Sequence, residues 1–309
     1  MVLICPRVHF YEINDQTWFP QYLREKVQSC LTLCWTFRAP ILQKVSPARL
    51  VASTLYDVLG EEIEKYTYVD FCAGAGGPTP FIEKDLNAQL SSASSKKSPS
   101  DKTRPKRRSR TAAQSKGGGD GVKFVLTDLH PHIPDWTEAS KQSDNLSFVS
   151  ESVDASNAPA SLNRDGKRKI FRLYNLAFHH FDKELGSAIL RNTLETADGF
   201  GIFELQERTI SSFITITAMG LLMFLITPYY FWRSPGHLFF TYVIPVIPFV
   251  LVFDGYVSSL RTRSAEEVQV LMRDCGASTG SWTVRSGEGQ HTWPTGYMTW
   301  VIGTQGSSI

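Results

Sequence analysis

The chain has 309 residues, of which 42% are hydrophobic, so it can bury one large core or two smaller ones. Its formal net charge is +2, but residues 88–121 carry nine Lys and Arg against two Asp, which leaves the remainder mildly acidic. That basic stretch lacks the interleaved aromatic side chains that stack on bases. The composition therefore argues against a general nucleic-acid-binding surface, and we expect no nucleic-acid partner.

The cysteines and the N-terminus indicate a reducing compartment. Five cysteines form no Cys-x-x-Cys pair, and we expect reduced thiols. They are Cys5, Cys30, Cys34, Cys72 and Cys275. The first residues, Met-Val-Leu-Ile-Cys-Pro-Arg, contain no basic leader and no apolar segment of signal length. We therefore expect no secretion, and a soluble part that faces the cytosol.

Residues 1–65 predict a helical cap that packs over the rest of the chain or closes a substrate pocket. Apolar spacing predicts a first helix with Pro20 in its first turn and with Asp15 or Thr17 as its N-cap. A second helix is predicted over residues 47–59, with its apolar side chains on one face and a glycine directly after it.

The stretch Tyr68–Pro80 predicts a short buried strand that runs into a glycine-rich turn. Asp70 lies near the end of the strand, and Gly74, Gly76 and Gly77 allow the backbone to bend and to approach a ligand closely. Glycines at this spacing also occur in ordinary turns, so the rest of the chain has to decide between a ligand site and a simple bend.

Residues 81–90 predict a helix that begins at the turn, and residues 91–121 predict a disordered insertion. The insertion contains mostly Ser, Lys, Arg and Gly, and it has too few apolar side chains to offset the entropy of ordering. Its basic core, residues 105–110, is typical of a solvated loop, a nuclear import signal or a contact for anionic lipid.

Acidic side chains follow two further predicted strands. Residues 122–126 form an apolar run that leads to Asp128. Asp128 follows Gly76 by about 20 residues once the insertion is removed, which is the spacing at which nucleotide-binding folds place an acid on the ribose hydroxyls. The next apolar run, residues 146–149, leads to Asp154. These acids are candidate partners for the glycine turn.

The alternation of strand and helix patterns then continues. Residues 170–176 predict a strand that contains Asn175, residues 183–196 predict a helix, and residues 201–205 predict another strand. Such alternation is typical of an α/β fold, a doubly wound parallel sheet with helices on both faces. Ligands of such folds lie over the carboxyl ends of the strands.

Two long uncharged segments follow. Residues 213–232 form a run of membrane-spanning length, and residues 238–253 form a shorter run broken by Pro245 and Pro248. They predict an inserted hydrophobic helical hairpin that either crosses a membrane twice or stays buried or interfacial beside the sheet. Asp254 and Gly255 are expected to close the hairpin.

The C-terminal part is expected to complete the sheet. Ser264 and Glu267 form a capping box that starts a helix. Residues 281–284 and 297–303 predict a terminal antiparallel strand pair. The predicted division is a helical cap over 1–65, a cofactor-binding core over 66–210 with the insertion 91–121, a hydrophobic transmembrane hairpin over 211–254, and the completion of the sheet over 255–309.

Together, the pattern Asp70-x-Cys-x-Gly74-x-Gly76, the acids Asp128 and Asp154, Asn175 and the closing strand pair resemble a class I S-adenosylmethionine-dependent methyltransferase. The resemblance covers roughly residues 66–303. It implies a Rossmann-like methyltransferase sheet and S-adenosyl-L-methionine as cofactor. The implied cofactor-binding residues are Asp70, Gly74, Gly76, Asp128, Asp154 and Asn175.

The resemblance also implies a role for several of these residues. The glycines approach the methionine part of the cofactor, Asp128 holds the ribose hydroxyls, and Asp154 meets the adenine amino group. Cys72 departs from the family pattern, because a glycine usually stands there. That departure concerns how closely the backbone approaches the cofactor.

Three longer phrases are similar to a membrane-associated branch that includes fungal methyltransferases acting on polyketides of the pyrone-polyene kind. They are Asp-Gln-Thr-Trp-Phe-Pro over 15–20, Ala-Phe-His-His-Phe-Asp over 177–182, and the stretch 254–267. This similarity implies O-methylation of a lipophilic small molecule in secondary metabolite biosynthesis, mycotoxins included, by an enzyme associated with a membrane.

His179 and His180 are the predicted catalytic residues, because an imidazole can accept a proton from an acceptor hydroxyl near neutral pH. Capping or packing is the alternative role for the pair, and Glu204 is a weaker catalytic candidate. A zinc site that joins the pair with His130 and His132 is not expected, since no cysteine or acid lies at metal-ligand spacing, so we expect no metal.

Two other functions stay open. A membrane-anchored scaffold would keep the cofactor fold without turnover, and a nucleic-acid methyltransferase would be recruited by the basic loop. Neither the acceptor nor the oligomeric state follows from the sequence.

Overall fold

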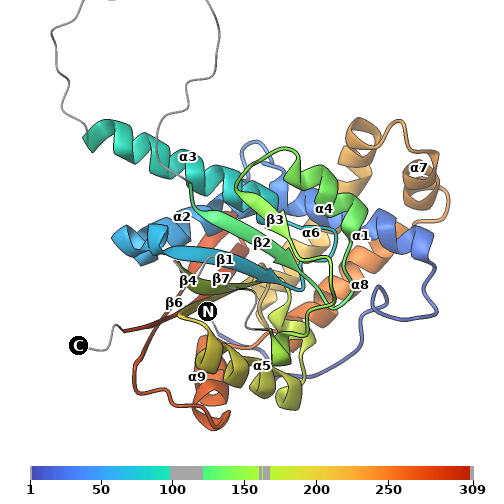
Figure 1. Cartoon of the computed structure of the whole chain (residues 1–309). Coiled ribbons are helices and arrows are strands. Elements are labelled where there is room, and N and C mark those ends of the chain that lie inside the picture. The colour runs from blue at the N-terminus through green and yellow to red at the C-terminus, as the bar shows by residue number, and fades with distance from the viewer. Residues whose placement is uncertain (1, 98–120, 160–161, 163–167, 307–309) are drawn as a thin grey trace, which may run out of the picture.

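The computed structural model describes residues 2–97, 121–159, 162 and 168–306 (Figure 1). Its centre is a seven-stranded sheet with the strand order β3-β2-β1-β4-β5-β7-β6. The strands are β1 (Tyr66–Phe71), β2 (Lys123–Thr127), β3 (Leu146–Phe148), β4 (Lys169–Asn175), β5 (Gly199–Glu204), β6 (Trp282–Thr292) and β7 (Gly296–Gln305).

Strands β1 to β5 are parallel, whereas β7 runs antiparallel to both β5 and β6. The chain order reverses between β1 and β4, so the carboxyl ends of these two strands border the crevice in which open α/β sheets bind their ligands. The predicted fold class is confirmed: an α/β, doubly wound, Rossmann-like methyltransferase sheet with a terminal antiparallel pair. Strands β6 and β7 are longer than predicted.

Helices cover both faces of the sheet (Figure 1). Tyr68 packs into a core with α2 (Pro47–Leu59), α3 (Thr79–Lys97) and α4 (Ile133–Ser140). The next residue, Val69, points to the other face and packs into a second core with α5 (Lys183–Thr196) and α9 (Ala265–Asp274). Successive side chains of a strand alternate between faces, and both faces are covered, which is why the central strands β1, β4 and β5 are buried along nearly their whole length.

Several predicted helices have the expected bounds. Helix α2 ends at Gly60, whose φ of +55° favours glycine. Helix α9 begins with the predicted capping box between Ser264 and Glu267.

Helix α3 continues to Lys97, past the predicted boundary with the insertion. The rest of that insertion, residues 98–120, lies outside the described residues.

The predicted N-cap of the first helix is wrong. Helix α1 (Gln21–Thr36) has Pro20 as its N-cap residue, and no side chain caps it. Neither Asp15 nor Thr17 reaches its first turn. Asp15 contacts His180 instead, with 2.9 Å between Oδ2 and Nδ1. A carboxylate in this segment therefore serves the loop after β4 rather than a helix.

The hydrophobic segment folds as three helices, α6 (Ile210–Tyr230), α7 (Pro235–Tyr242) and α8 (Val246–Arg261). Asp254 and Gly255 do not close a hairpin, because α8 continues through them to Arg261. Asp254 is accommodated inside the helix because its carboxylate accepts hydrogen bonds from the backbone N–H groups of Ile13 and Asn14, at 2.7 and 2.9 Å.

By length and composition α6 alone among the described helices could cross a membrane, and α7 with α8 would form a second span only if this pair, bent by 71°, were counted as one. The first turns of α6 pack beside β7, and the Thr215 hydroxyl donates to that of Thr295, in the turn between β6 and β7, at 2.9 Å. Helices α1, α6, α7 and α8 pack together at one side of the sheet (Figure 1).

Candidate active site

The glycine-rich turn joins β1 to α3 at the carboxyl edge of the sheet. Gly74 and Gly76 have φ angles of +52° and +101°, in the left-handed region that favours glycine. Cys72 also lies in this region, with a φ of +62°. The cysteine that departs from the family pattern therefore still takes a glycine-like backbone conformation, and the turn is kept.

Asp70 is fully buried beneath the turn. Its carboxylate accepts hydrogen bonds from the Thr79 hydroxyl at 2.5 Å and from the Asn175 amide nitrogen at 3.3 Å. Burial, with a smaller contribution from the charge of Asp128, raises the pKa of Asp70 to about 7 against the opposing effect of the two hydrogen bonds. A ligand cation beside this carboxyl would therefore favour its ionised form near neutral pH.

Asp128 and Asp154 lie near the turn at the ends of the neighbouring strands. Asp128 accepts backbone N–H hydrogen bonds from Gly74 and His130, both at 2.8 Å, so it fixes the turn. Asp154 is exposed and accepts from the Ser156 N–H at 2.8 Å, at the start of the 3-10 helix η2 (Ala155–Asn157). The structure brings both acids to the edge predicted for the cofactor.

A cavity of about 330 Å³ connects the turn with the histidine pair. Of the predicted site residues, five line it, namely Asp70, Gly74, Asn175, His179 and His180, whereas Gly76, Asp128 and Asp154 do not. Oδ1 of Asn175 is buried and has no hydrogen-bond partner, so it is available to a ligand. Apolar side chains of α1, α6 and α8 form much of the remaining wall.

His179 is fully buried in the 3-10 helix η4 (Phe178–His180). Its Nδ1–H donates to Oε2 of Glu204 at 2.8 Å, and its backbone N–H donates to Oε1 of the same carboxylate at 3.0 Å. Burial alone would lower the pKa of His179, but the carboxylates of Glu204 and Glu12 raise it to about 9. Glu204, the weaker catalytic candidate, therefore orients His179.

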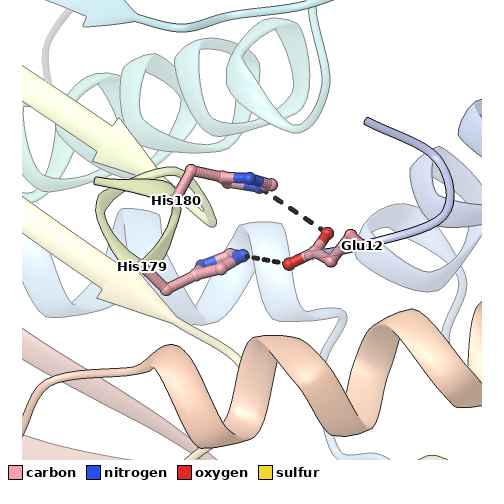
Figure 2. A group of neighbouring side chains, drawn as sticks. All are labelled: Glu12, His179 and His180. Atoms are coloured by element: carbon pink, nitrogen blue, oxygen red, sulfur yellow. Dashed lines mark ion pairs between the residues drawn. The ribbon is translucent and has the colours of Figure 1, made fainter. Parts of the chain in front are cut away.

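His180 is partly open to solvent, with 32% of its side chain exposed. Its Nδ1 donates to Asp15, which leaves Nε2 directed toward Oε2 of Glu12 at 3.9 Å. Oε1 of Glu12 lies 3.4 Å from Nε2 of His179. Figure 2 shows the Glu12 carboxylate, from the N-terminal segment, pointing at both imidazole rings.

Three arginines hold the loop that carries the histidines. Arg261 donates to the carbonyl oxygens of His179 and His180 at 3.2 and 2.8 Å. Arg7 and Arg263 both donate to the carbonyl of Phe181, at 2.7 and 2.9 Å. The backbone acceptors of the loop are thereby satisfied, and the two rings are fixed relative to the cavity.

Glu12, Asp15 and Arg261 were not predicted as site residues. The sequence held a signal for Asp15 and Arg261, because both belong, with His179 and His180, to the three phrases that carried the narrower resemblance, whereas Glu12 lies outside these phrases. These phrases, far apart in the chain, meet at this site. Burial of Glu12 alone would raise its pKa, but His180, His179 and Arg261 lower it to about 2.

No family model matches the sequence, and no curated protein matches it. An O-methyltransferase family protein from Burkholderia thailandensis has 11% identity and a TM-score of 0.40, over 85% of this chain and 58% of that one. The CurJ carbon methyltransferase has 10% identity and a TM-score of 0.44, over 84% and 54%.

A third similar structure is the plantazolicin methyltransferase BpumL in complex with SAH, with 12% identity and a TM-score of 0.43 over 92% of this chain and 99% of that one. This chain spans somewhat over half the length of the first two proteins. Similarities at such identities and TM-scores identify no family and support no statement about activity, so the fold rests on the strand order itself.

Proposed function

We propose that this protein is an S-adenosylmethionine-dependent methyltransferase that methylates an oxygen of a lipophilic small molecule. One observation carries the proposal: a single cavity is lined by the glycine-turn residues Asp70 and Gly74, by the histidine pair, and by apolar side chains of α1 and α6. A donor site and an acceptor site in one cavity are what a methyl transfer requires.

The residues at the turn fit the implied cofactor. The position of a Cβ on Gly74 has no protein atom within 4 Å, so the space beside this residue is open. Asp70 and the unpartnered Oδ1 of Asn175 are acceptors suited to the ammonium group of the methionine part. Asp128 and Asp154 are proposed to meet the ribose and the adenine, as the resemblance implies.

The cofactor supplies an electrophilic methyl group on a sulfonium, so the chain mainly has to align the acceptor and to help remove its proton. The histidine pair also lines the cavity, although it lies far from the turn in the sequence. It is the group available to act on an acceptor hydroxyl. His179 is enclosed by two carboxylates, whereas the side chain of His180 is 32% exposed and lines the cavity.

The apolar part of the cavity supports a lipophilic acceptor. Val27, Leu31 and Trp35 of α1 and Met219 and Met223 of α6 line it. Lining of this kind favours an extended hydrocarbon or polyene over a sugar or a nucleotide. The resemblance to fungal tailoring enzymes supports a polyketide of the pyrone-polyene kind and a role in secondary metabolite biosynthesis.

Helix α6 supports association with a membrane, because it buries polar side chains and exposes apolar ones, the reverse of a helix on the surface of a soluble protein. Its buried positions include Ser212, Thr215 and Thr227, whereas Leu221 and Leu225 are 64% and 74% exposed. Exposed apolar side chains of this size favour lipid over water. Since the first turns of α6 are docked on the sheet, we propose insertion into one leaflet rather than a full crossing.

The test is transfer of a radioactive methyl group. The purified protein is incubated with methyl-labelled S-adenosylmethionine and with an organic extract of host cells in which the gene has been deleted. The proposal predicts label in a lipophilic product that the wild-type host contains and the deletion strain lacks. Cofactor binding without transfer to any extracted compound would instead support the scaffold, and transfer to nucleic acid alone would support recruitment by the basic loop.

A further inference from the structure

We propose that Glu12, His179 and His180 bind one divalent transition-metal ion on the wall of the cavity (Figure 2). The two imidazole nitrogens and a carboxylate oxygen lie within 4.8 Å of one another. A tetrahedral zinc ion with bonds of about 2.1 Å keeps its ligand atoms about 3.4 Å apart. The spacing of 3.4 Å between Nε2 of His179 and Oε1 of Glu12 equals this value.

An unpartnered buried atom points into the site. Nε2 of His179 has no hydrogen-bond partner, and the side chain is only 1% exposed. The ring nitrogen lies 3.4 Å from Glu12, outside hydrogen-bond geometry. A buried polar atom left in this way costs free energy unless a ligand satisfies it, and a metal ion between the nitrogen and the carboxylate would do so.

Each proposed ligand is oriented by a second group. Nδ1–H of His179 donates to Glu204 at 2.8 Å, and Nδ1–H of His180 donates to Asp15 at 2.9 Å. In both rings the carboxylate accepts from Nδ1–H and so leaves Nε2, the atom that faces Glu12, as the ring nitrogen that an ion would bind in place of a proton. This carboxylate–histidine arrangement is the usual support of metal-binding histidines.

Glu12 is oriented too, because its Oε1 accepts a hydrogen bond from the Ser258 hydroxyl at 2.9 Å. Nη1 of Arg261 also lies 3.4 Å from Oε1, so an ion would share this carboxylate with a guanidinium. Two imidazoles and one carboxylate suit zinc or another transition metal better than magnesium or calcium.

The role of the ion rests on the proposed function. All three ligands line the cavity, so a further coordination position is open to an acceptor. Positive charge there lowers the pKa of a hydroxyl. The O–H bond breaks with its proton passing to water, the oxygen electron pair forms the bond to the methyl carbon, and the carbon–sulfur bond breaks with its electrons left on sulfur. The sulfonium thereby becomes a thioether.

This inference reverses the expectation that the chain binds no metal. His130 and His132, which were considered with the pair from the sequence, are not part of the cluster that the structure brings together. The acid that completes the site comes from the N-terminal segment, so no local spacing could show it.

The experiment uses the full-length protein, treated with a chelator, desalted and supplied with Zn²⁺. Bound metal is measured by mass spectrometry of the element, and affinity by competition with a chromogenic chelator. We expect one ion per chain in the wild type and at least 100-fold weaker binding in His180→Ala. Asp15→Asn, which removes only the orienting group, should weaken binding by about 10- to 100-fold.

His132→Ala is the matched control, because His132 is also partly exposed, at 30%, and also faces an aspartate, Asp135, at 3.7 Å. It should bind like the wild type. Cys72→Ser tests adventitious binding to the exposed thiol. Absence of stoichiometric zinc in the wild type, unchanged affinity in His180→Ala, or loss confined to Cys72→Ser would each overturn the proposal.

Binding of S-adenosylhomocysteine is measured on the same samples. Binding of zinc without binding of S-adenosylhomocysteine would support the metal site and contradict the proposed methyltransferase. Binding of S-adenosylhomocysteine without binding of zinc would support the methyltransferase and contradict the metal site. Zn²⁺ should also raise the melting temperature of the wild type and of His132→Ala but not that of His180→Ala, which separates loss of a ligand from loss of folding.

Discussion

Oε1 of Glu12 lies 3.4 Å from Nε2 of His179, and this contact ties the N-terminal segment to the loop after β4. The same segment adds backbone hydrogen bonds, from Ile4 N–H to the Arg208 carbonyl at 2.9 Å and from Val8 N–H to the Leu260 carbonyl at 3.0 Å. The N-terminal residues are therefore part of the site as well as of its covering.

Glu12→Gln should destabilise the protein. The variant keeps the shape of the side chain but removes the charge that faces His179, His180 and Arg261 in a buried setting. Removal of one partner from a buried ion pair costs about 3–5 kcal/mol. Thermal unfolding should show a clearly lower melting temperature, whereas Glu25→Gln on the exposed side of α1 should stay within about 0.5 kcal/mol of the wild type. Equal stability of the two variants would contradict the role of Glu12.

Asp70 should make cofactor binding depend on pH. Its pKa of about 7 lies above the ordinary value of 3.8, so the free protein loses stability as pH rises through this range and Asp70 ionises. A positively charged cofactor favours the ionised carboxyl, and its affinity should rise by about eightfold between pH 6 and pH 7.5. Calorimetry on the wild type and on Asp70→Asn checks this, because the variant should bind weakly with no such slope.

Gly74→Ala should weaken cofactor binding without a special loss of stability. Gly60 is the control, since its φ angle of +55° is close to the +52° of Gly74 and neither residue has an atom within 4 Å of an added Cβ. Alanine is strained at both positions because φ is positive, and at Gly60 the ψ of −128° adds to this strain. Only Gly74 lines the cavity. We expect at least tenfold weaker binding of S-adenosylhomocysteine for Gly74→Ala and unchanged binding for Gly60→Ala, and equal affinities would sink the assignment.

Leu225→Glu should release the protein from membranes. Leu225 is 74% exposed on α6, and a charge in the apolar region of a bilayer costs about 2.5–3.5 kcal/mol. Flotation with phosphatidylcholine vesicles should show at least a tenfold lower bound fraction. Leu185→Glu on α5, which replaces a leucine that is 42% exposed on another part of the surface, should float like the wild type. If neither wild type nor control floats, leaflet insertion is wrong.

Much of the fold was predictable because it follows local patterns. Runs of apolar residues mark the parallel strands; Asp128 comes directly after β2, and Asp154 follows β3 after a short loop. Helix α2 has both an N-cap, Ser46, and a C-terminal glycine, so its bounds were predictable to the residue. The capping box at Ser264 likewise depends only on neighbours in the sequence.

The rest depends on contacts between distant segments. Asp254 resembles the polar end of a hairpin, yet backbone N–H groups of the N-terminal segment satisfy it inside α8. Asp15 is of a residue type that often caps helices, yet it orients His180. In the sequence, Glu12 is separated from both histidines by most of the cofactor-binding core. No local period or spacing could place these three carboxylates.

The most direct test of the account is equilibrium binding of S-adenosylmethionine to the wild type and to Asp128→Ala. Asp128 accepts from the Gly74 N–H at 2.8 Å and stands at the end of β2, where the account places the ribose. We predict saturable one-to-one binding that Asp128→Ala weakens at least tenfold. Asp144→Ala, which changes an exposed acid before β3, should leave binding unchanged. Absence of wild-type binding, or equal binding by all three proteins, would contradict it.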